Sequence, residues 1–171
     1  MKWCTIKKGY ISYLKRFEEK IPNIDYGPEK FKPFLNPLFE KDELIYVTQV
    51  SHPQRRHEYI KENVDFIKLF DKTKLIGVVN LNYMFPVPKE LIINIEKYSD
   101  VSVHRTFETD KEKNDYIALL KKEMKEIQNK RISEKAELLY DRKNNYPEDS
   151  VSKRCINFKE LEEKALEYKE A

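Results

Sequence analysis

The sequence contains few of the residues that hold small secreted or metal-binding domains together. Only two of its 171 residues are cysteine, Cys4 and Cys155, and they lie near opposite ends of the chain without a CxxC pair. This excludes a zinc ribbon or a thioredoxin-like motif. The first residues lack the apolar run of a secretory signal, so we expect reduced thiols, although a disulfide between the two stays open.

Long hydrophobic runs are missing as well. No uncharged stretch approaches the roughly 20 apolar residues that cross a bilayer, and we therefore expect a cytoplasmic protein without a membrane partner. Aromatic residues make up 12% and hydrophobic residues 40% of the chain, which argues against wholesale disorder. The length and the lack of a low-complexity linker predict a single domain over residues 1–171.

An excess of charge of one sign is also lacking. Charged residues make up 37% of the chain, yet 33 basic and 30 acidic residues leave a net charge of only +3. Such a balance is typical of a solvated surface and does not by itself indicate nucleic-acid binding. A nucleic-acid site must therefore be sought as a local cluster.

Proline and glycine are concentrated in the front half of the chain. Every proline except Pro147 lies at or before Pro88, which predicts short strands and loops there and long helices behind them. We expect an α+β fold in which Pro86 closes the most apolar strand. The expected strands are 3–6, 34–39, 44–50, 64–70, 75–85 and 91–95; the expected helices are 10–21, 110–144 as one bent helix or two, and a last one from 158.

One polar segment stands out directly after a predicted strand. Within seven residues it holds a serine, a glutamine, two arginines and two histidines: Ser51, His52, Gln54, Arg55, Arg56 and His57. A loop that follows a rigid strand is a common way to position reactive groups. Histidine transfers protons near neutral pH and arginine binds phosphate, so these side chains suit metal-free cleavage of RNA. A solvated loop on a charge-rich protein is the other interpretation.

A metal site is not indicated. His52 and His57 are five residues apart with Pro53 between them, so they are not the i, i+4 helical pair of metallohydrolases. His104 is remote and the cysteines are not clustered. We therefore expect neither a metal nor another cofactor.

Further residues allow a functional and a structural interpretation. Lys7 and Lys8 precede Tyr10 at a strand-to-helix corner, where an exposed tyrosine stacks on a base. The apolar pattern itself favours Tyr10 as the first buried residue of the helix. Asn80 interrupts the most apolar strand and either lines a site or faces an edge. The lysines between 111 and 131 form a solvated helix face or contact phosphates.

Four segments share their order and spacing with a known family. They are residues 5–17 (TIKKGYISYLKRF), 46–53 (YVTQVSHP, followed by basic residues), 76–87 (IGVVNLNYMFPV) and 155–164 (CINFKELEEK). Together they resemble the ToxN/AbiQ family, the endoribonuclease toxins of type III toxin–antitoxin systems. The second segment is similar to the family's strand and Ser/Thr-Ser-Pro-Lys-like loop, and the third to its central strand.

The resemblance implies a compact antiparallel, partly barrel-like sheet akin to the MazF/Kid toxins, with an N-terminal helix and long C-terminal helices. It implies a metal-independent endoribonuclease that uses the 2′-OH as nucleophile and leaves a 2′,3′-cyclic phosphate. The implied partners are target RNAs and a cognate antitoxin RNA, a repeated pseudoknot that the toxin trims from its precursor. Protein and RNA form closed rings in the family, often three of each, and the systems cause abortive infection by phage.

The resemblance also gives the polar segment its roles. Ser51 matches the family's serine or threonine at the strand end and contacts the scissile phosphate or the 2′-OH. His52 stands where the family often has serine and moves protons, with His57 as a second candidate. Gln54 stands where a catalytic lysine is common, so the cation is expected from an arginine, with Arg55 assigned to the phosphorane.

RNA-binding roles follow in the same way. Tyr10 matches the family's tyrosine at the start of the first helix and would position a base. Asn80 matches the strand asparagine. Lys7, Lys8 and Arg56 complete the expected RNA-binding set, which we expect to form one basic cluster with His52 and Arg55.

Two other classes of function stay open. In a non-catalytic RNA-binding module the same basic loop only grips phosphates, so RNA is bound in EDTA without being cleaved. A protein-interaction scaffold built on the long helices has no salt-sensitive affinity for RNA.

Overall fold

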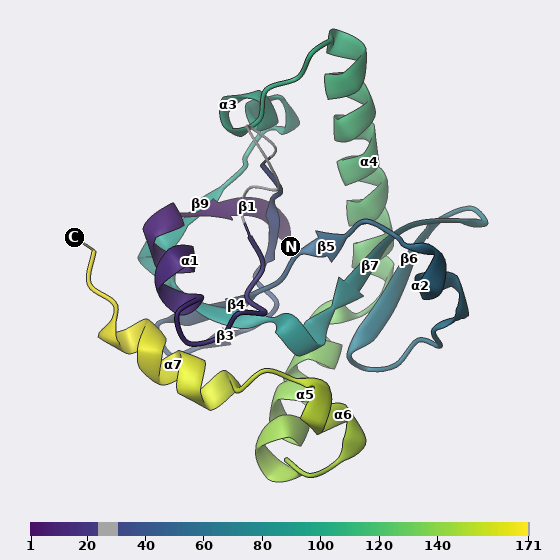
Figure 1. The fold of residues 1–171 in the computed structure, drawn as a ribbon. Helices are drawn as coiled ribbons and strands as arrows, with labels where there is room; N and C mark the ends of the chain where they lie inside the picture. The colour runs from purple at the N-terminus through teal and green to yellow at the C-terminus, as the bar shows by residue number, and fades with distance from the viewer. Residues whose placement is uncertain (24–30, 171) are drawn as a thin grey trace.

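The computed structural model describes residues 1–23 and 31–170, and in them the strands form three antiparallel three-stranded sheets (Figure 1). The first has β1 (Lys2–Ile6) between β2 (Phe34–Asn36) and β9 (Ile92–Asn94). The second has β4 (Leu44–Val47) between β3 (Glu40–Lys41) and β8 (Phe85–Pro88). The third has β7 (Lys74–Asn80) between β5 (Val50–Ser51) and β6 (Phe66–Asp71).

Two stretches of chain connect the second sheet to the third. Only Thr48 and Gln49 separate β4 from β5, and the 3₁₀ helix Leu81–Tyr83 joins β7 to β8. Thr48 also forms an isolated bridge with Leu35 of β2. The three sheets are therefore neighbours in one antiparallel framework, and β5 is an outer strand of the third.

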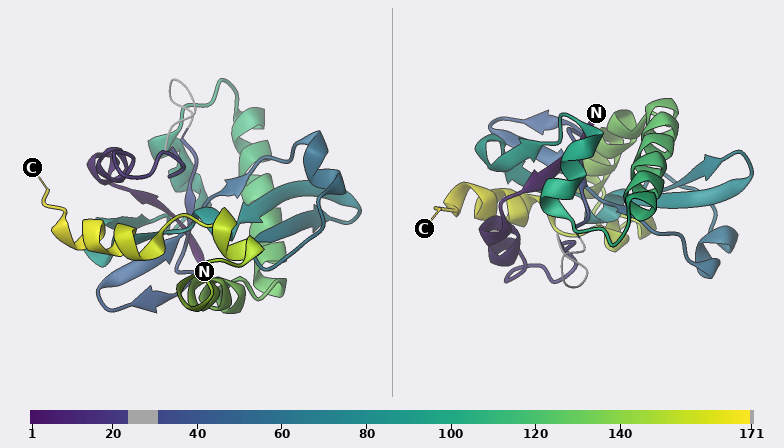
Figure 2. Two further views of the ribbon diagram at one scale, coloured as in Figure 1. Left: turned by 60° about the horizontal axis from the view of Figure 1, so that its bottom comes forward. Right: turned by 90° about the horizontal axis from the view of Figure 1, so that it is seen from above.

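Helices surround this framework (Figure 2). The described residues contain α1 (Lys8–Leu14), α2 (Arg55–Tyr59), α3 (Val101–His104), α4 (Asp110–Asn129), α5 (Ile132–Asn145), α6 (Ser150–Arg154) and α7 (Phe158–Glu167), with further 3₁₀ turns at Lys89–Leu91 and Tyr98–Asp100. In all views α1 and α7 lie together on one side of the molecule, and α2 lies on the opposite side. This separation decides which of the expected site residues meet.

The core forms where amphipathic helices cover the sheets. Leu120, Met124 and Ile127 recur on one face of α4, are buried, and pack over β6 and β7. Phe158 and Leu161 do the same for α7 over β8. Burying each such side chain stabilises the fold by roughly 1.5–3 kcal/mol.

Side-chain caps fix where the two helices begin. Thr109 accepts a hydrogen bond from the backbone N–H of Glu112, as its position before the apolar pattern predicts. Asn157 accepts one from Glu160 in the same way. The α+β class and the helical back half are confirmed. Cys4 and Cys155 are free, as expected, and both are buried.

The first helix is shorter than expected. The spacing predicts a helix from 10 to 21, but α1 ends at Leu14 and the chain turns through residues 15–17. Ile21 is buried, while Phe17 remains 38% exposed. The apolar residues beyond Leu14 therefore keep the helical spacing without forming one buried helix face.

The prolines expected to close the strand 75–85 lie inside β8 instead. Pro86 pairs with Tyr46 and Pro88 with Leu44. β8 is an outer strand of its sheet, the position where a residue without an N–H is tolerated. The carbonyl of Pro86 accepts a hydrogen bond from the hydroxyl of Tyr10 and therefore does not lack a partner.

The stretch 110–144, expected as one bent helix or two, forms two helices. α4 ends at Asn129 and α5 starts at Ile132, because Arg131 takes a left-handed conformation with φ 54°. The strand expected at 34–39 is likewise interrupted at Pro37, which leaves β2 and β3 as separate short strands. The short helices α2, α3 and α6 were not predicted.

Candidate functional site

The end of β5 separates two hollows of the molecular surface. β5 pairs with β7, with Ser51 opposite Val78, and the chain then turns at Pro53 into α2. Successive side chains of a strand point to opposite faces. Val50 and Ser51 of β5 accordingly line different hollows, and His52, the residue after the strand, lines the same hollow as Val50. We call these the Ser51 groove and the His52 pocket.

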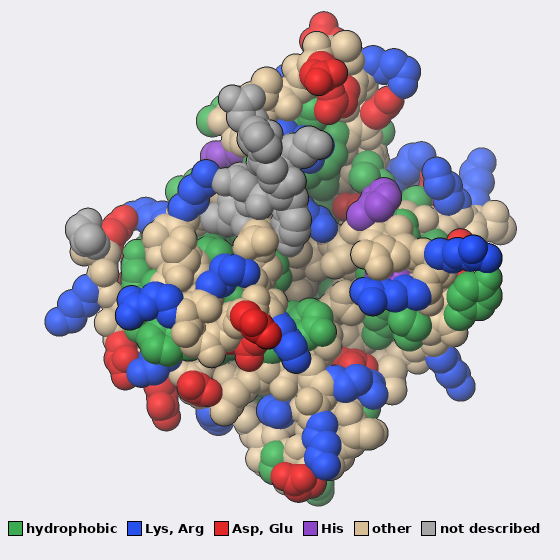
Figure 3. All heavy atoms as spheres, viewed as in Figure 1, with side chains coloured by type: hydrophobic (Ala, Val, Ile, Leu, Met, Phe, Trp, Pro, Cys, Tyr) green, Lys and Arg blue, Asp and Glu red, His purple; other side chains and the backbone are tan. Residues whose placement is uncertain are grey.

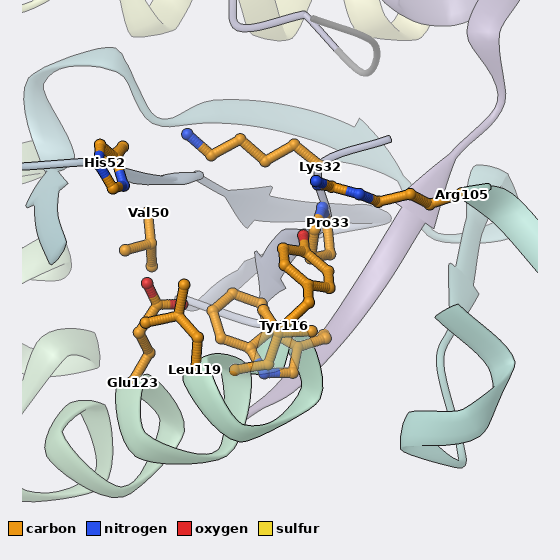
Figure 4. A pocket seen from close by; sticks show the side chains of 10 residues that line it. Lys32, Pro33, Val50, His52, Arg105, Tyr116, Leu119 and Glu123 are labelled. Carbon is orange, nitrogen blue, oxygen red and sulfur yellow. The ribbon is translucent and has the colours of Figure 1, made fainter. Parts of the chain in front are cut away.

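The His52 pocket is a cavity of about 460 Å³ between α4 and the sheets (Figure 4). Its walls are mostly apolar, and its charged or titratable side chains are a histidine, a lysine, an arginine, a tyrosine and a glutamate. The lining residues are Trp3, Lys32, Pro33, Val50, His52, Arg105, Tyr116, Leu119, Leu120 and Glu123. They come from β1, the segment before β2, β5, the end of α3 and α4.

Two cations reach the His52 pocket. The guanidinium of Arg105 stacks 4.3 Å from the ring centroid of Tyr116 and donates a hydrogen bond to the carbonyl of Phe31. Figure 4 shows the side chain of Lys32 extending toward His52. Burial lowers the pKa of Lys32, and Glu123 opposes that effect. Both cations are positioned to face an anionic ligand.

Glu123 is the buried acid of this pocket. Its side chain is 6% exposed, and burial raises its pKa to about 8 in spite of the opposing charge of Lys32. The carboxyl lies over Gly77 of β7, where an added Cβ would come within 3.1 Å of its Oε1 atom. At neutral pH this carboxyl is therefore mostly protonated.

The Ser51 groove runs along the other side of β5. It consists of two adjoining hollows of about 230 and 450 Å³ that share Arg56, His57, Asn80 and Tyr83. The first is completed by Lys20, Pro22, Thr48, Gln49, Ser51 and Gln54. The second is completed by Ile60, Lys61, Asn63, Asp65, Phe66, Asn82 and Arg154.

His57 lies in the floor of the groove and is only 5% exposed. Its Nδ1 accepts a hydrogen bond of 3.0 Å from the backbone N–H of Gln54, which fixes the start of α2. Burial lowers the pKa of His57, as do Arg56 and Lys68, so the ring is neutral and carries its proton on Nε2. In that form His57 is a hydrogen-bond donor and not a base.

An ion pair closes the far end of the groove. Arg154 of α6 donates two hydrogen bonds of 2.9 Å to the buried carboxylate of Asp65. Asn82 donates to the carbonyl of Arg154, while its own Oδ1 is buried without a hydrogen-bond partner. The groove is thus lined by amides, an aromatic ring and guanidinium groups, which suit a nucleotide chain.

The structure brings together only part of the predicted site. Ser51, Gln54, Arg56, His57 and Asn80 share the Ser51 groove, and His52 stands on its rim facing the other pocket. The expectation that Arg55 lies with them is wrong, because it faces a separate hollow beside Lys68 and Lys74 on the outer side of α2.

The residues expected from the first helix are also displaced. Tyr10 is completely buried, so the prediction that it stacks on a base is wrong; its hydroxyl donates to Pro86 and its ring contacts Tyr168. Lys7 pairs with Glu170 at 2.8 Å, and Lys8 is exposed at the start of α1. Because α1 and α2 lie on opposite sides, the single basic cluster does not form (Figure 1). Figure 3 shows basic side chains spread over this face instead.

Sequence reasoning missed Lys32, Arg105, Tyr116 and Glu123 of the His52 pocket, and Tyr83 and Arg154 of the groove. One signal was available: Glu123 falls between Leu120 and Met124 on the buried face of α4, where an acid is out of place. In residues 1–23 and 31–170, no group of three or more metal-ligating side chains is placed to hold an ion. No helix in the described part of the chain is long and apolar enough to cross a membrane.

Comparison with known proteins supplies independent findings. The family model "Toxin ToxN, type III toxin-antitoxin system" matches residues 2–166. Endoribonuclease ToxN of Pectobacterium atrosepticum is 32% identical over 92 residues, which are 51% of this chain and 54%, about half, of that protein. Endoribonuclease ToxN of Bacillus thuringiensis subsp. kurstaki is 27% identical over 170 residues, 99% of this chain and 84% of that protein.

Solved structures share the fold over the whole chain. A protein of a bacterial antiviral system regulated by a processed non-coding RNA superposes with a TM-score of 0.78 at 24% identity, covering 99% of this chain and all of the other. AbiQ, a lactococcal anti-phage endoribonuclease of a type III toxin–antitoxin system, gives 0.76 at 19% identity and covers 98% of this chain and 96% of its own.

Proposed function

Since the chain belongs to the ToxN family of type III toxin–antitoxin toxins, we propose that it is a toxin endoribonuclease held inactive by a cognate antitoxin RNA. The observation that carries this proposal is the strand end at Ser51 and His52, which stands between two hollows lined by cations. One side offers Arg56 and the other Lys32 and Arg105. A phosphodiester that crosses this strand end meets positive charge on both sides.

We propose that the reaction is metal-independent transesterification at this strand end. His52 takes the proton of the 2′-OH, and the 2′-oxygen attacks the adjacent phosphorus. Ser51 donates a hydrogen bond to the phosphate, and Lys32 and Arg105 stabilise the charge that develops on it. The P–O5′ bond breaks, leaving a 2′,3′-cyclic phosphate and a 5′-hydroxyl. Lys32 thus fills the cationic role that Gln54 lacks.

The Ser51 groove holds the RNA on one side of the scissile bond. Tyr83 is half-buried and offers the ring that Tyr10 cannot. Arg56 and Lys61 face the phosphates, and Asn80 and the Nε2–H of His57 bind polar edges. This contact set accepts a single strand without requiring a duplex.

The proposed partner is an antitoxin RNA of repeated pseudoknots that the enzyme trims from its precursor. AbiQ is an anti-phage protein, and another solved relative is selectively inhibited by a non-coding RNA pseudoknot. We extend these roles to this chain, with closed rings such as three proteins with three RNAs and action in the cytoplasm against phage. A partial barrel of the MazF/Kid kind belongs to the same proposal and is supported by the bridge between Leu35 and Thr48.

The test is cleavage of RNA by purified protein in EDTA, with the ends identified by mass spectrometry. We expect 2′,3′-cyclic phosphate ends, lost at least 100-fold in the variants His52→Ala and Lys32→Ala. Ser51→Ala should be impaired less, because it removes one hydrogen bond. Lys169→Ala, an exposed residue beyond α7, is the control. Binding without cleavage by the wild type would make the protein an RNA-binding module and contradict the enzyme.

A further inference from the structure

The proposed reaction leaves one proton unassigned, and this inference rests on that proposed function. When the P–O5′ bond breaks, the 5′-oxygen must receive a proton. His52 is occupied as the base. His57 is neutral and tied to Gln54, and it lines the groove and not the pocket. The donor must therefore be sought among the groups that face the His52 pocket.

We propose that Glu123 is a catalytic residue that donates the proton taken up by the leaving 5′-oxygen in the His52 pocket. Four titratable or charged side chains face this pocket besides His52: Lys32 before β2, Arg105 after α3, and Tyr116 and Glu123 on α4. An arginine keeps its proton at any physiological pH. Burial raises the pKa of Tyr116 to about 12, which makes its hydroxyl a poor acid.

The fold positions the Glu123 carboxyl for this role. It arises from the buried face of α4 and lies over Gly77 of β7, the strand that pairs with β5. A Cβ at Gly77 would meet Val50 at 2.7 Å and Glu123 at 3.1 Å, so the glycine leaves the room that the carboxyl occupies. In the view of Figure 4 the carboxyl group of Glu123 ends beside Val50, on the side of that side chain away from His52, and all three residues line the same pocket.

Burial keeps the proton on this carboxyl until it is needed. A charged carboxylate would repel the phosphate, whereas the protonated form does not. Lys32, whose charge is felt at Glu123, stabilises the carboxylate once the proton has left. The pKa of about 8 therefore reflects an acid that is loaded at neutral pH and has a cation ready for its conjugate base.

The step balances without a further reactant. The O2′–P bond forms as the 2′-OH proton passes to His52, and the P–O5′ bond breaks as the proton of Glu123 passes to O5′. His52 ends protonated and Glu123 ends as carboxylate. After the products leave, His52 loses one proton to water and Glu123 regains one from water.

The decisive substrate carries sulfur in place of the 5′-bridging oxygen, because a thiolate leaves without a proton. We expect Glu123→Gln to cleave ordinary RNA at least 100-fold more slowly than the wild type. On the 5′-thio RNA the same variant should recover to within about tenfold of the wild type. Glu137→Gln, an exposed glutamate on α5, is the matched control and should behave as wild type on both substrates.

Three outcomes would overturn the assignment. Equal losses on both substrates would make Glu123 a structural residue, and no loss on ordinary RNA would exclude it from catalysis. If Lys32→Ala and not Glu123→Gln were rescued by sulfur, Lys32 would be the donor. Failure of the wild type to cleave either RNA would contradict the proposed function itself, which is a separate result.

The pH profile supplies a readout that a structural role would not change. Wild-type cleavage of ordinary RNA should decline above pH about 8, where Glu123 loses its proton. This decline at high pH should be absent with the 5′-thio substrate and in the variant Glu123→Gln. It should persist in Glu137→Gln. A decline that persists in Glu123→Gln would assign the proton to another group.

Discussion

Ser51 ends β5 and His52 follows it, yet they face different hollows, as Val50 and Ser51 within the strand do. The consequence is a division of labour between two neighbours. Ser51 shares its groove with amides and an aromatic ring, and His52 shares its pocket with the buried acid Glu123. The proposed base and the proposed acid thus line one pocket, and the side chains proposed to bind nucleotides line the groove on the other side of the strand end.

Glu123 should cost the protein stability, and the cost should depend on pH. Its pKa is about 8 in the folded chain against an ordinary value of 4.5. Between these values the folded state keeps a proton that the unfolded state releases, so stability falls as pH rises through this window. We expect the stability of Glu123→Gln relative to wild type to rise from pH 4.5 to 8, by a few kcal/mol in total.

Urea unfolding of both proteins at pH 4.5, 6 and 8.5 measures this difference, and the contributions of the other titrating groups cancel in it. The amide that Glu123→Gln introduces also changes the free energy of unfolding when it lacks a hydrogen-bond partner, but by an amount that does not depend on pH. A difference that stays constant over the three pH values would show that Glu123 is not protonated in the folded state. When a residue is retained for function at the expense of stability, its replacement gives a variant that is more stable but less active.

The sequence predicted the segment of the site but not its composition. Serine, histidine and arginine after a strand indicated phosphate chemistry, and Ser51 and His52 do lie at a strand end between two hollows. Which of Arg55 and Arg56 faces the groove depended on a five-residue helix too short to show a period. Lys32 and Glu123 lie 20 or more residues from His52 along the chain, so only the fold brings them together.

At the scale of elements, Gly77 of β7 faces both Val50 of β5 and Glu123 of α4. β7 is the middle strand of its sheet and lies against both β5 and α4. The space above Gly77 is shared by Val50 and Glu123, so one missing side chain permits both the strand pairing and the pocket. This explains a glycine in the most apolar strand of the sequence.

Replacement of Gly77 by alanine should therefore affect stability and activity together. The added methyl would meet Val50 Cγ1 at 2.7 Å, and overpacking of this kind costs about 1–3 kcal/mol. The atoms that the methyl would displace belong to Val50 of β5 and to Glu123. Cleavage should therefore also fall. Chemical denaturation and the EDTA cleavage assay measure the two effects.

Gly9→Ala is the matched control. The nearest atom to its added methyl is the Tyr168 hydroxyl at 3.1 Å, the end of a side chain near the end of the described chain. Alanine also suits a helix better than glycine, so we expect stability within about 1 kcal/mol of wild type. Equal losses of stability and cleavage in Gly77→Ala and Gly9→Ala would show that the space above Gly77 is not needed for Val50 and Glu123.

The larger elements followed from patterns and the smaller ones did not. α4 and α7 have apolar faces and side-chain caps, and both were predicted. The division of the expected strand 75–85 into β7 and β8 was missed. Proline usually marks the end of a strand in a sequence, whereas an outer strand such as β8 tolerates it. The left-handed conformation of Arg131, which separates α4 from α5, could not be predicted, because arginine is not a residue type that favours this conformation.

At the scale of the whole molecule, the net charge of +3 conceals where the cations are placed. Basic side chains are dispersed over the face shown in Figure 3, and several basic residues of the described chain are paired with acids, as Lys7 is with Glu170. Those at the groove and the pocket are few. RNA binding should therefore depend on a few positions and not on the total charge, and a near-neutral surface limits adsorption of unrelated RNA.

This distribution predicts a shallow salt dependence of RNA affinity. On the non-cleaving variant His52→Ala, contacts from Lys32, Arg56 and Lys61 to three phosphates give a slope of log K against log salt of about −2 for a single strand. Arg56→Ala should weaken binding and reduce the steepness by about 0.7. Arg55→Ala, its neighbour on the same helix but facing the separate hollow, should change neither. Fluorescence anisotropy titrations between 50 and 200 mM salt measure the slopes. Equal effects of the two arginines, or a slope much steeper than −2, would mean that RNA is held by the diffuse charge of the surface, and the groove would lose its proposed role.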